Sequence, residues 1–271
     1  MTPTPDPRTV AAVAGATAGA ATAAGVAGIA LLAGQAWRAR REIGMRTTVP
    51  PYADGRYGSR HGTSLRFVVL GDSGAASLGA VHPHETMGAI IATGIAAAAD
   101  RGVVLANMAV VGARSHDLAA QVERALVVRP HVVFIMIGGN DVTHLRGKRA
   151  PARELGEAVA TLRGAGCEVV VATCPDLGTV RPLGPPLRDV ARRLSRELAA
   201  AQTIAVVQAG GRTVSLGNLL GPEFEARPEA LFSPDRFHPS AEGYAAVAGA
   251  VLPSVLAALG LVDDDTDHGA S

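Results

Sequence analysis

Short, continuous apolar runs alternate with longer segments of helical periodicity along most of this 271-residue chain. Unbroken apolar runs are typical of strands that are covered on both faces, because neither face then meets water. Five strands are predicted, with a helix after each of the first four and another near the C-terminus. The expected strands are 65–70, 103–111, 131–137, 168–173 and 204–208. The expected helices are 85–100, 117–127, 152–164, 187–201 and 241–259.

This order of elements predicts an α/β fold, a three-layer α/β/α sandwich with a five-stranded parallel sheet between the helical layers. Ligands of such sheets bind at the carboxyl ends of the strands. Three polar motifs follow expected strands directly, namely Gly71-Asp72-Ser73, Gly112 and Gly138-Gly139-Asn140-Asp141. We therefore expect these motifs to lie along one edge of the sheet.

Ser73, His238 and Asp235 are the candidate catalytic residues. A serine becomes a nucleophile when a general base takes its proton, and a carboxylate must orient that base. Histidine exchanges protons near neutral pH, and the three-residue spacing lets Asp235 and His238 point from one turn toward a common site. The alternative is structural, since serine also caps helices and aspartate also favours turns.

The same edge of the sheet carries candidate donors for an oxyanion. Asn140 offers a side-chain amide, and Ser73 and Gly112 offer backbone N–H groups that could hold the negative oxygen of a tetrahedral intermediate. The carboxylate of Asp72 is expected to accept amide hydrogen bonds at the turn. Taken alone, Gly138-Gly139-Asn140-Asp141 also fits a tight turn.

With these motifs in this order, residues 66–259 resemble the GDSL hydrolases, also called SGNH hydrolases after the serine, glycine, asparagine and histidine of four ordered motifs. The resemblance implies a flavodoxin-like fold of the SGNH hydrolase type. Within the family, the pattern is most similar to bacterial esterases and lysophospholipase-like members, including arylesterase-type proteins. The implied roles are nucleophile and first oxyanion donor for Ser73, further oxyanion donors for Gly112 and Asn140, and general base with its partner for His238 and Asp235.

Gly74 departs from the family pattern, in which many relatives carry leucine. The expected activity is hydrolysis of carboxylic esters of short-chain or lipid-derived acids through an acyl-enzyme, with no cofactor. Acyl transfer, thioester hydrolysis and removal of acetyl groups from carbohydrates remain alternatives for the same residues. A membrane-tethered binding protein without catalysis is the alternative from a different class. The pocket walls are expected from loops 75–85 and 177–186.

The first 46 residues differ from the rest of the chain. No charged residue occurs from Val10 to Ala36, a run longer than the roughly 20 residues that span a bilayer. Trp37 and the arginines after it resemble an interfacial flank, which favours a membrane anchor. The side that the domain faces stays open, because the basic flank favours the cytoplasmic side whereas hydrolases that the chain resembles are often exported. A signal peptide that is cleaved on export is the competing interpretation. The expected layout is anchor 1–46, linker 47–63, hydrolase domain 64–260 and acidic disordered tail 261–271.

The composition limits the remaining classes of function. A formal net charge of +1, without a long basic stretch interleaved with aromatic residues, argues against nucleic-acid binding. Cys167 and Cys174 are expected at opposite ends of one strand, too far apart for a disulfide, so both are expected to be free. No spacing typical of metal ligands occurs, and no metal is expected. The sequence carries no signal for an oligomeric state.

Overall fold

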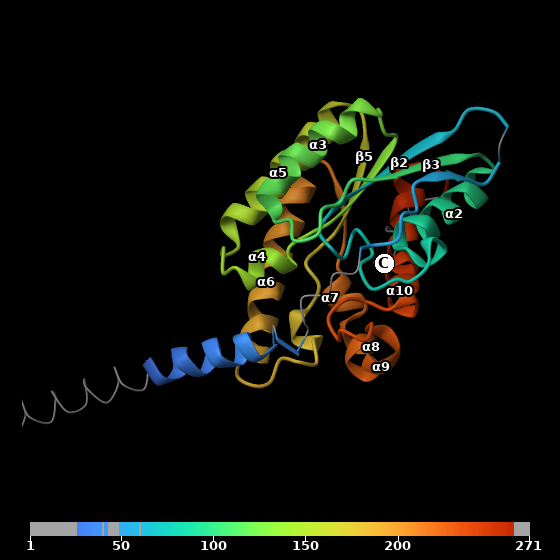
Figure 1. The fold of residues 1–271 in the computed structure, drawn as a ribbon. Helices are drawn as coiled ribbons and strands as arrows, with labels where there is room; N and C mark the ends of the chain where they lie inside the picture. Colours follow the sequence, from blue (N-terminus) through green and yellow to red (C-terminus); the bar gives the residue numbers. More distant parts are fainter. Residues whose placement is uncertain (1–25, 40, 43–48, 60, 263–271) are drawn as a thin grey trace, which may run out of the picture.

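The computed structural model describes residues 26–39, 41–42, 49–59 and 61–262. A six-stranded mixed sheet lies at its centre, in the spatial order β1-β3-β2-β4-β5-β6 (Figure 1). The last five strands in this order run parallel, and β1 pairs antiparallel with β3. The α/β sandwich is therefore confirmed, with one more strand than expected. The strands are β1 (Gly55–Tyr57), β2 (Leu65–Gly71), β3 (Val103–Asn107), β4 (Val132–Met136), β5 (Glu168–Ala172) and β6 (Arg212–Val214).

Helices cover both faces of the sheet. One face packs against α2 (Met87–Ala99) and α10 (Ala241–Ala258). The other face packs against α3 (Leu118–Val127), α5 (Arg149–Gly164) and α6 (Leu187–Gln208). The shorter helices α4 (Gly139–Thr143), α7 (Leu216–Leu219), α8 (Gly221–Ala226) and α9 (Pro228–Leu231), with the 3-10 turns η1 (Pro83–Glu85), η2 (Ser115–Asp117) and η3 (Leu177–Thr179), lie in the connections.

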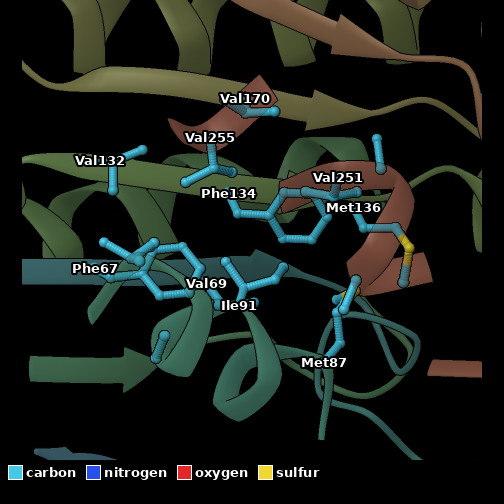
Figure 2. Close-up of a cluster of buried hydrophobic side chains, with 14 of the residues drawn as sticks. Phe67, Val69, Met87, Ile91, Val132, Phe134, Met136, Val170, Val251 and Val255 are labelled. Carbon is cyan, nitrogen blue, oxygen red and sulfur yellow. The ribbon is translucent and has the colours of Figure 1, made fainter. Parts of the chain in front are cut away.

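Side-chain alternation along the strands divides the core into two layers. In β2, Phe67 and Val69 belong to the cluster under α2 and α10, whereas Val68 and Leu70 belong to the cluster under α3, α5 and α6. Figure 2 shows the first of these clusters, in which side chains of β2, β4 and β5 meet side chains of α2 and α10. Burial on both faces explains why the strands have continuous apolar runs.

The prediction of a fifth strand at residues 204–208 is wrong. This segment continues α6, and the strand at that sheet edge is β6. Its β-branched residues favour a strand by propensity, but Leu198, Gln202 and Val206 are buried at a spacing of four residues, which is a helical stripe. Ile204 and Val207, at 60% and 59% exposed, face solvent from the same helix. Burial on one helical face therefore outweighs the local strand propensity.

Two terminal segments lie partly or wholly outside the described residues. Residues 1–25, 40 and 43–46 of the expected anchor and residues 263–271 of the expected tail are outside them, whereas 26–39 and 41–42 are helical. Among the described residues, α10 alone is long and apolar enough to cross a membrane. Its residues Tyr244, Val247 and Val251 are buried against the sheet, so its apolar character fits a core helix. The segment expected as linker, 47–63, contributes β1.

Candidate active site

Ser73 stands on a tight turn at the carboxyl end of β2. Gly71 has a φ of 135°, and a Cβ there would lie 1.9 Å from the backbone oxygen of Met136 on the neighbouring strand. Glycine is therefore needed at this position. The next residue, Asp72, donates its backbone N–H to the same Met136 oxygen at 3.2 Å, and its Oδ1 accepts the N–H of Gly74 at 3.0 Å. The hydrogen bond expected from a backbone amide to the Asp72 carboxylate is thus present. Ser73 itself is half-buried.

The carboxyl group of Asp72 is itself buried behind the turn. Burial raises its pKa to about 6, against the lowering effect of the hydrogen bond from Gly74 and of the nearby His238. A buried carboxylate is costly to ionise, so this side chain retains a proton at higher pH than an ordinary aspartate.

A compact loop before α10 carries Asp235 and His238. The backbone N–H of Ser233 donates to the oxygen of His238 at 2.8 Å, and the N–H of Arg236 donates to the oxygen of Ser233 at 2.8 Å. Arg236 has a φ of 59°, a conformation that is uncommon for a residue with a side chain. These bonds close the loop, so that Asp235 and His238 face the same way.

The carboxylate of Asp235 is fully engaged. Oδ1 accepts hydrogen bonds from Ser233 Oγ at 2.8 Å and from the backbone N–H groups of Phe237 and His238 at 2.9 Å each. Oδ2 lies 2.7 Å from Nδ1 of His238. Burial would raise the pKa of Asp235, but the hydrogen bonds from His238 and the two backbone amides outweigh it and hold the pKa well below its usual range. Asp235 is therefore ionised at neutral pH.

Ser73, His238 and Asp235 form one hydrogen-bonded chain. Nε2 of His238 lies 3.0 Å from Ser73 Oγ, across a sequence separation of 165 residues. Because the ionised Asp235 accepts from Nδ1, that nitrogen carries the hydrogen and Nε2 is free to accept the serine proton. The ring of Phe237 meets the imidazole edge to face, with centroids 4.9 Å apart. This arrangement can deprotonate Ser73 for attack on an electrophilic carbon.

The expected oxyanion donors are brought together only in part. Asn140, on α4, lines the same cavity as Ser73 and His238. Its Nδ2 donates to the backbone oxygen of Ala113 at 3.0 Å. Gly112 has a φ of 83° and lies on an exposed loop, and it is not among the residues that line the cavity. The contact between Asn140 and Ala113 nevertheless ties that loop to α4.

Asp141, the last residue of Gly138-Gly139-Asn140-Asp141, holds the same two segments together. It is fully buried, and its carboxylate accepts from the backbone N–H and the hydroxyl of Ser115, the latter at 2.8 Å. Arg146 bonds Asp141 at 3.0 Å and Glu154 at 2.8 Å. The charge of a buried carboxylate is therefore compensated, and the loop after β3 is fixed beside Asn140.

Two buried glutamines form contacts that the sequence motifs do not indicate. Gln121, on α3, bonds both backbone groups of Gly71. Gln202, on α6, accepts from the N–H of Cys174 at 2.7 Å and donates to the oxygen of Ile137 at 3.0 Å, which joins the ends of β4 and β5. The sequence signal that could indicate such contacts is a polar residue at a helix position where the spacing of apolar residues predicts burial.

An apolar cavity opens beside Ser73 and His238. The expected loop 177–186 contributes Leu177 and Val180, but loop 75–85 contributes none of its lining residues. Further lining comes from α7, α8 and the loop that carries His238. Its apolar side chains are those of Leu216, Leu220, Phe224, Phe232 and Phe237. Such a surface can bury an aliphatic group.

No group of three or more His, Cys, Asp or Glu side chains that could hold a metal ion occurs within the described residues. Cys167 and Cys174 are both buried and free, as expected. Burial raises the pKa of each thiol, which disfavours the reactive thiolate.

Comparison with known proteins shows the family of the chain. The pattern of the GDSL-like Lipase/Acylhydrolase family matches residues 69–246, more than half of the chain. The chain belongs to the GDSL-like lipase/acylhydrolase family. A GDSL-like esterase of Mycobacterium tuberculosis strain H37Rv is 42% identical in an alignment 230 residues long, and the alignment covers 80% of this chain and 73% of that protein. Membership in this family of esterases and acylhydrolases supports a hydrolase activity.

Solved structures of other proteins share the GDSL-like fold. Axe2, an acetyl xylan esterase of Geobacillus stearothermophilus, aligns with a TM-score of 0.56 at 20% identity, over 73% of this chain and 95% of that one. A lipolytic G-D-S-L family protein of Veillonella parvula DSM 2008 aligns with a TM-score of 0.56 at 16% identity, over 70% of this chain and 97% of that one. At these identities the likeness concerns the fold alone.

Proposed function

We propose that this protein is a serine esterase that hydrolyses carboxylic esters through an acyl-enzyme. The observation that carries the proposal is the hydrogen-bonded chain from Asp235 through His238 to Ser73, which ends beside an apolar cavity. In this assignment Ser73 is the nucleophile, His238 the general base and Asp235 the group that orients the imidazole.

The reaction proceeds in two halves. Ser73 Oγ attacks the ester carbonyl while Nε2 of His238 takes the hydroxyl proton, which gives a tetrahedral intermediate. His238 then protonates the leaving alcohol as the C–O bond breaks, and the acyl group remains on Ser73. In the second half, His238 takes a proton from water, the water attacks the acyl carbon, and His238 returns the proton to Ser73 as the acid leaves.

The negative oxygen of each intermediate needs donors. We assign this role to the side-chain amide of Asn140 and to the backbone N–H groups of Ser73 and Gly112. Removing one such donor typically lowers the rate about a hundredfold to a thousandfold. The hydrogen bond between Asn140 and Ala113 O supports this grouping, since it keeps the loop beside Asn140.

The substrate is proposed to be an ester of a short-chain or lipid-derived aliphatic acid, whose acyl group occupies the cavity lined by Leu220 and Phe224. Thioesters and acyl transfer to an alcohol use the same residues and remain alternatives. A sugar acetate, the substrate class in the name of Axe2, is disfavoured by the apolar lining.

Hydrolysis of p-nitrophenyl esters from acetyl to palmitoyl tests the proposal. Wild-type protein should release p-nitrophenol, and Ser73→Ala and His238→Ala should abolish release while keeping the far-UV circular dichroism spectrum. Equal activity in wild type and Ser73→Ala would refute the serine mechanism. A parallel panel of thioesters and acetylated sugars separates the alternatives.

We also propose that the uncharged run Val10–Ala36 anchors the protein to a membrane, with cleavage and export as the alternative. Support comes from its length, from the exposed apolar side chains of Val26 and Ile29 and from the stacking of Arg41 over Trp37. After alkaline extraction, full-length protein should stay in the membrane fraction and a chain without residues 1–46 should not. Release of both forms would contradict anchoring, and an N-terminus shortened in the exported protein would indicate cleavage.

A further inference from the structure

The residue before the nucleophile turn is held by a side chain outside every motif. Gln121 projects from α3 and is 1% exposed. Its Oε1 accepts the backbone N–H of Gly71 at 2.8 Å, and its Nε2 donates to the backbone oxygen of Gly71 at 2.9 Å. One side chain therefore satisfies both polar groups of the glycine at which β2 turns toward Ser73.

The same oxygen of Gly71 also accepts the backbone N–H of Val110 at 3.0 Å. Val110 lies two residues before Gly112, on the loop that Asn140 contacts through Ala113. Gln121 thus bonds directly to the point where the nucleophile turn meets the loop after β3.

The burial of Gln121 needs an explanation, because an amide removed from water is costly unless it is bonded. Its buried neighbours on α3, Leu118, Val122 and Ala125, pack into the apolar cluster, and packing alone would be served by another apolar residue. Each amide atom of Gln121 instead meets one group of Gly71, whose φ of 135° sets the direction of the chain into Asp72 and Ser73.

We propose that Gln121 is a positioning residue that fixes the Gly71 peptide and thereby the attack geometry of Ser73. The proposal rests on the proposed function, since it assigns Gln121 to the same reaction. A small displacement of a reacting atom is enough to slow a reaction, because attack needs near-contact alignment.

The test compares full-length Gln121→Met, which keeps the side-chain length but makes no hydrogen bond to either group, with Val122→Ala, which weakens the packing of the same helix and leaves both hydrogen bonds to Gly71 in place. Both are measured with p-nitrophenyl esters and by the rate at which a fluorophosphonate labels Ser73. For Gln121→Met we expect kcat and the labelling rate to fall by about tenfold to a hundredfold. KM should stay within about twofold of wild type. Val122→Ala should lower the melting temperature and leave kcat and labelling unchanged.

Gln121→Glu provides a readout that a merely structural role would not change. A protonated carboxyl group can accept from the N–H and donate to the oxygen of Gly71 as the amide does, whereas a carboxylate can only accept. The activity of Gln121→Glu relative to wild type should therefore be high near about pH 6 and fall toward about pH 9, as the buried acid ionises. This variant also keeps the test usable if Gln121→Met fails to fold.

Two results would overturn the inference, namely wild-type kcat in Gln121→Met or an equal loss of kcat in Val122→Ala. A flat ratio between Gln121→Glu and wild type over the pH range would also contradict it. If Ser73→Ala keeps wild-type activity, the proposed function itself fails. If Ser73 is essential and Gln121→Met is fully active, only the positioning role fails.

Discussion

Asp235 holds His238 at two points: one carboxylate oxygen accepts the backbone N–H of His238 at 2.9 Å, and the other lies 2.7 Å from its ring nitrogen Nδ1. A single side chain thus fixes both the main chain and the rotation of the imidazole. Because Ser73 Oγ is 3.0 Å from Nε2, the ring tautomer set by Asp235 decides whether the serine proton has an acceptor.

Asp235→Asn should lower kcat by about 10³-fold to 10⁴-fold and leave the fold intact. An amide N–H directed at Nδ1 favours the hydrogen on Nε2, which then cannot accept from Ser73. Steady-state kinetics with p-nitrophenyl esters measure the loss. Ser233→Ala is the matched control, because it removes one hydrogen bond from the same carboxylate without contact to the ring, and it should lose far less activity. Comparable kcat values in Asp235→Asn and wild type would contradict the tautomer argument.

Asp72 should make stability depend on pH. Its folded pKa of about 6 lies above the ordinary value of 3.8, so the folded protein binds more protons than the unfolded chain between these values. The contribution of Asp72 to the free energy of unfolding is therefore largest below about pH 4 and falls until about pH 6, by up to about 3 kcal/mol.

Asp72→Asn removes this dependence while keeping an oxygen that can accept from Gly74. The difference in free energy of unfolding between Asp72→Asn and wild type should therefore shift in favour of the variant as the pH rises through this window. Urea unfolding of both proteins at several pH values measures it. A difference that stays constant with pH would show that Asp72 ionises like an exposed carboxyl.

Gly71→Ala should destabilise the protein by at least about 3 kcal/mol, since the added Cβ combines a strained φ with a backbone clash. The clashing atom is the oxygen of Met136, 1.9 Å from the ideal Cβ position, and β4 cannot move away without breaking its pairing with β2. Urea unfolding measures the change. Gly164→Ala, at the exposed end of α5 with no atom within 4 Å of its Cβ, should cost nothing measurable. Similar stabilities of the two variants would show that the turn adapts.

The sequence alone is sufficient to select candidate site residues where the chemical type of a residue and its spacing from others both carry information. The sequence selects Ser73, Asp235 and His238 as a group, because a nucleophile, a base and a carboxylate in a workable order are an uncommon combination. Their catalytic roles stay a prediction. The family and the layered fold followed from the same motifs and from the apolar runs. Their hydrogen-bond distances depend on tertiary packing and could not be derived in this way.

Other features are invisible to local reasoning. The spacing along α3 indicates that Gln121 is buried, but its hydrogen-bond partner, Gly71, is known only once α3 is packed against the end of β2. The cavity wall from Leu216 to Phe224 consists of short helices that follow β6, and its place beside Ser73 depends on the course of the whole chain. The prediction of a strand at 204–208 is wrong because it rests on the β-branched residues of this segment. The helical spacing of its buried positions is the signal that indicates the helix.

If the protein acts as the proposed esterase, Phe224→Leu should shift its preference toward longer acyl chains. The ring of Phe224 lines the cavity beside Ser73 and packs edge to face on Phe232, with centroids 5.1 Å apart. Leucine is smaller than phenylalanine, so the acyl chain gains space where the ring stood. The ratio of kcat/KM for a long ester to that for a short ester should rise by about tenfold, the effect of one or two methylene groups in an apolar pocket.

Leu219→Ala is the matched control for this prediction, because Leu219 lies on the adjacent helix α7 but is 59% exposed and does not line the cavity. For Leu219→Ala, the ratio of kcat/KM for the long ester to that for the short ester should equal the wild-type ratio. Melting temperatures of both variants separate a change in the cavity from a general loosening of α7 and α8. If Phe224→Leu is folded and active but keeps the wild-type ratio, the acyl group does not contact this wall, and the cavity beside Ser73 then holds the alcohol part of the ester instead.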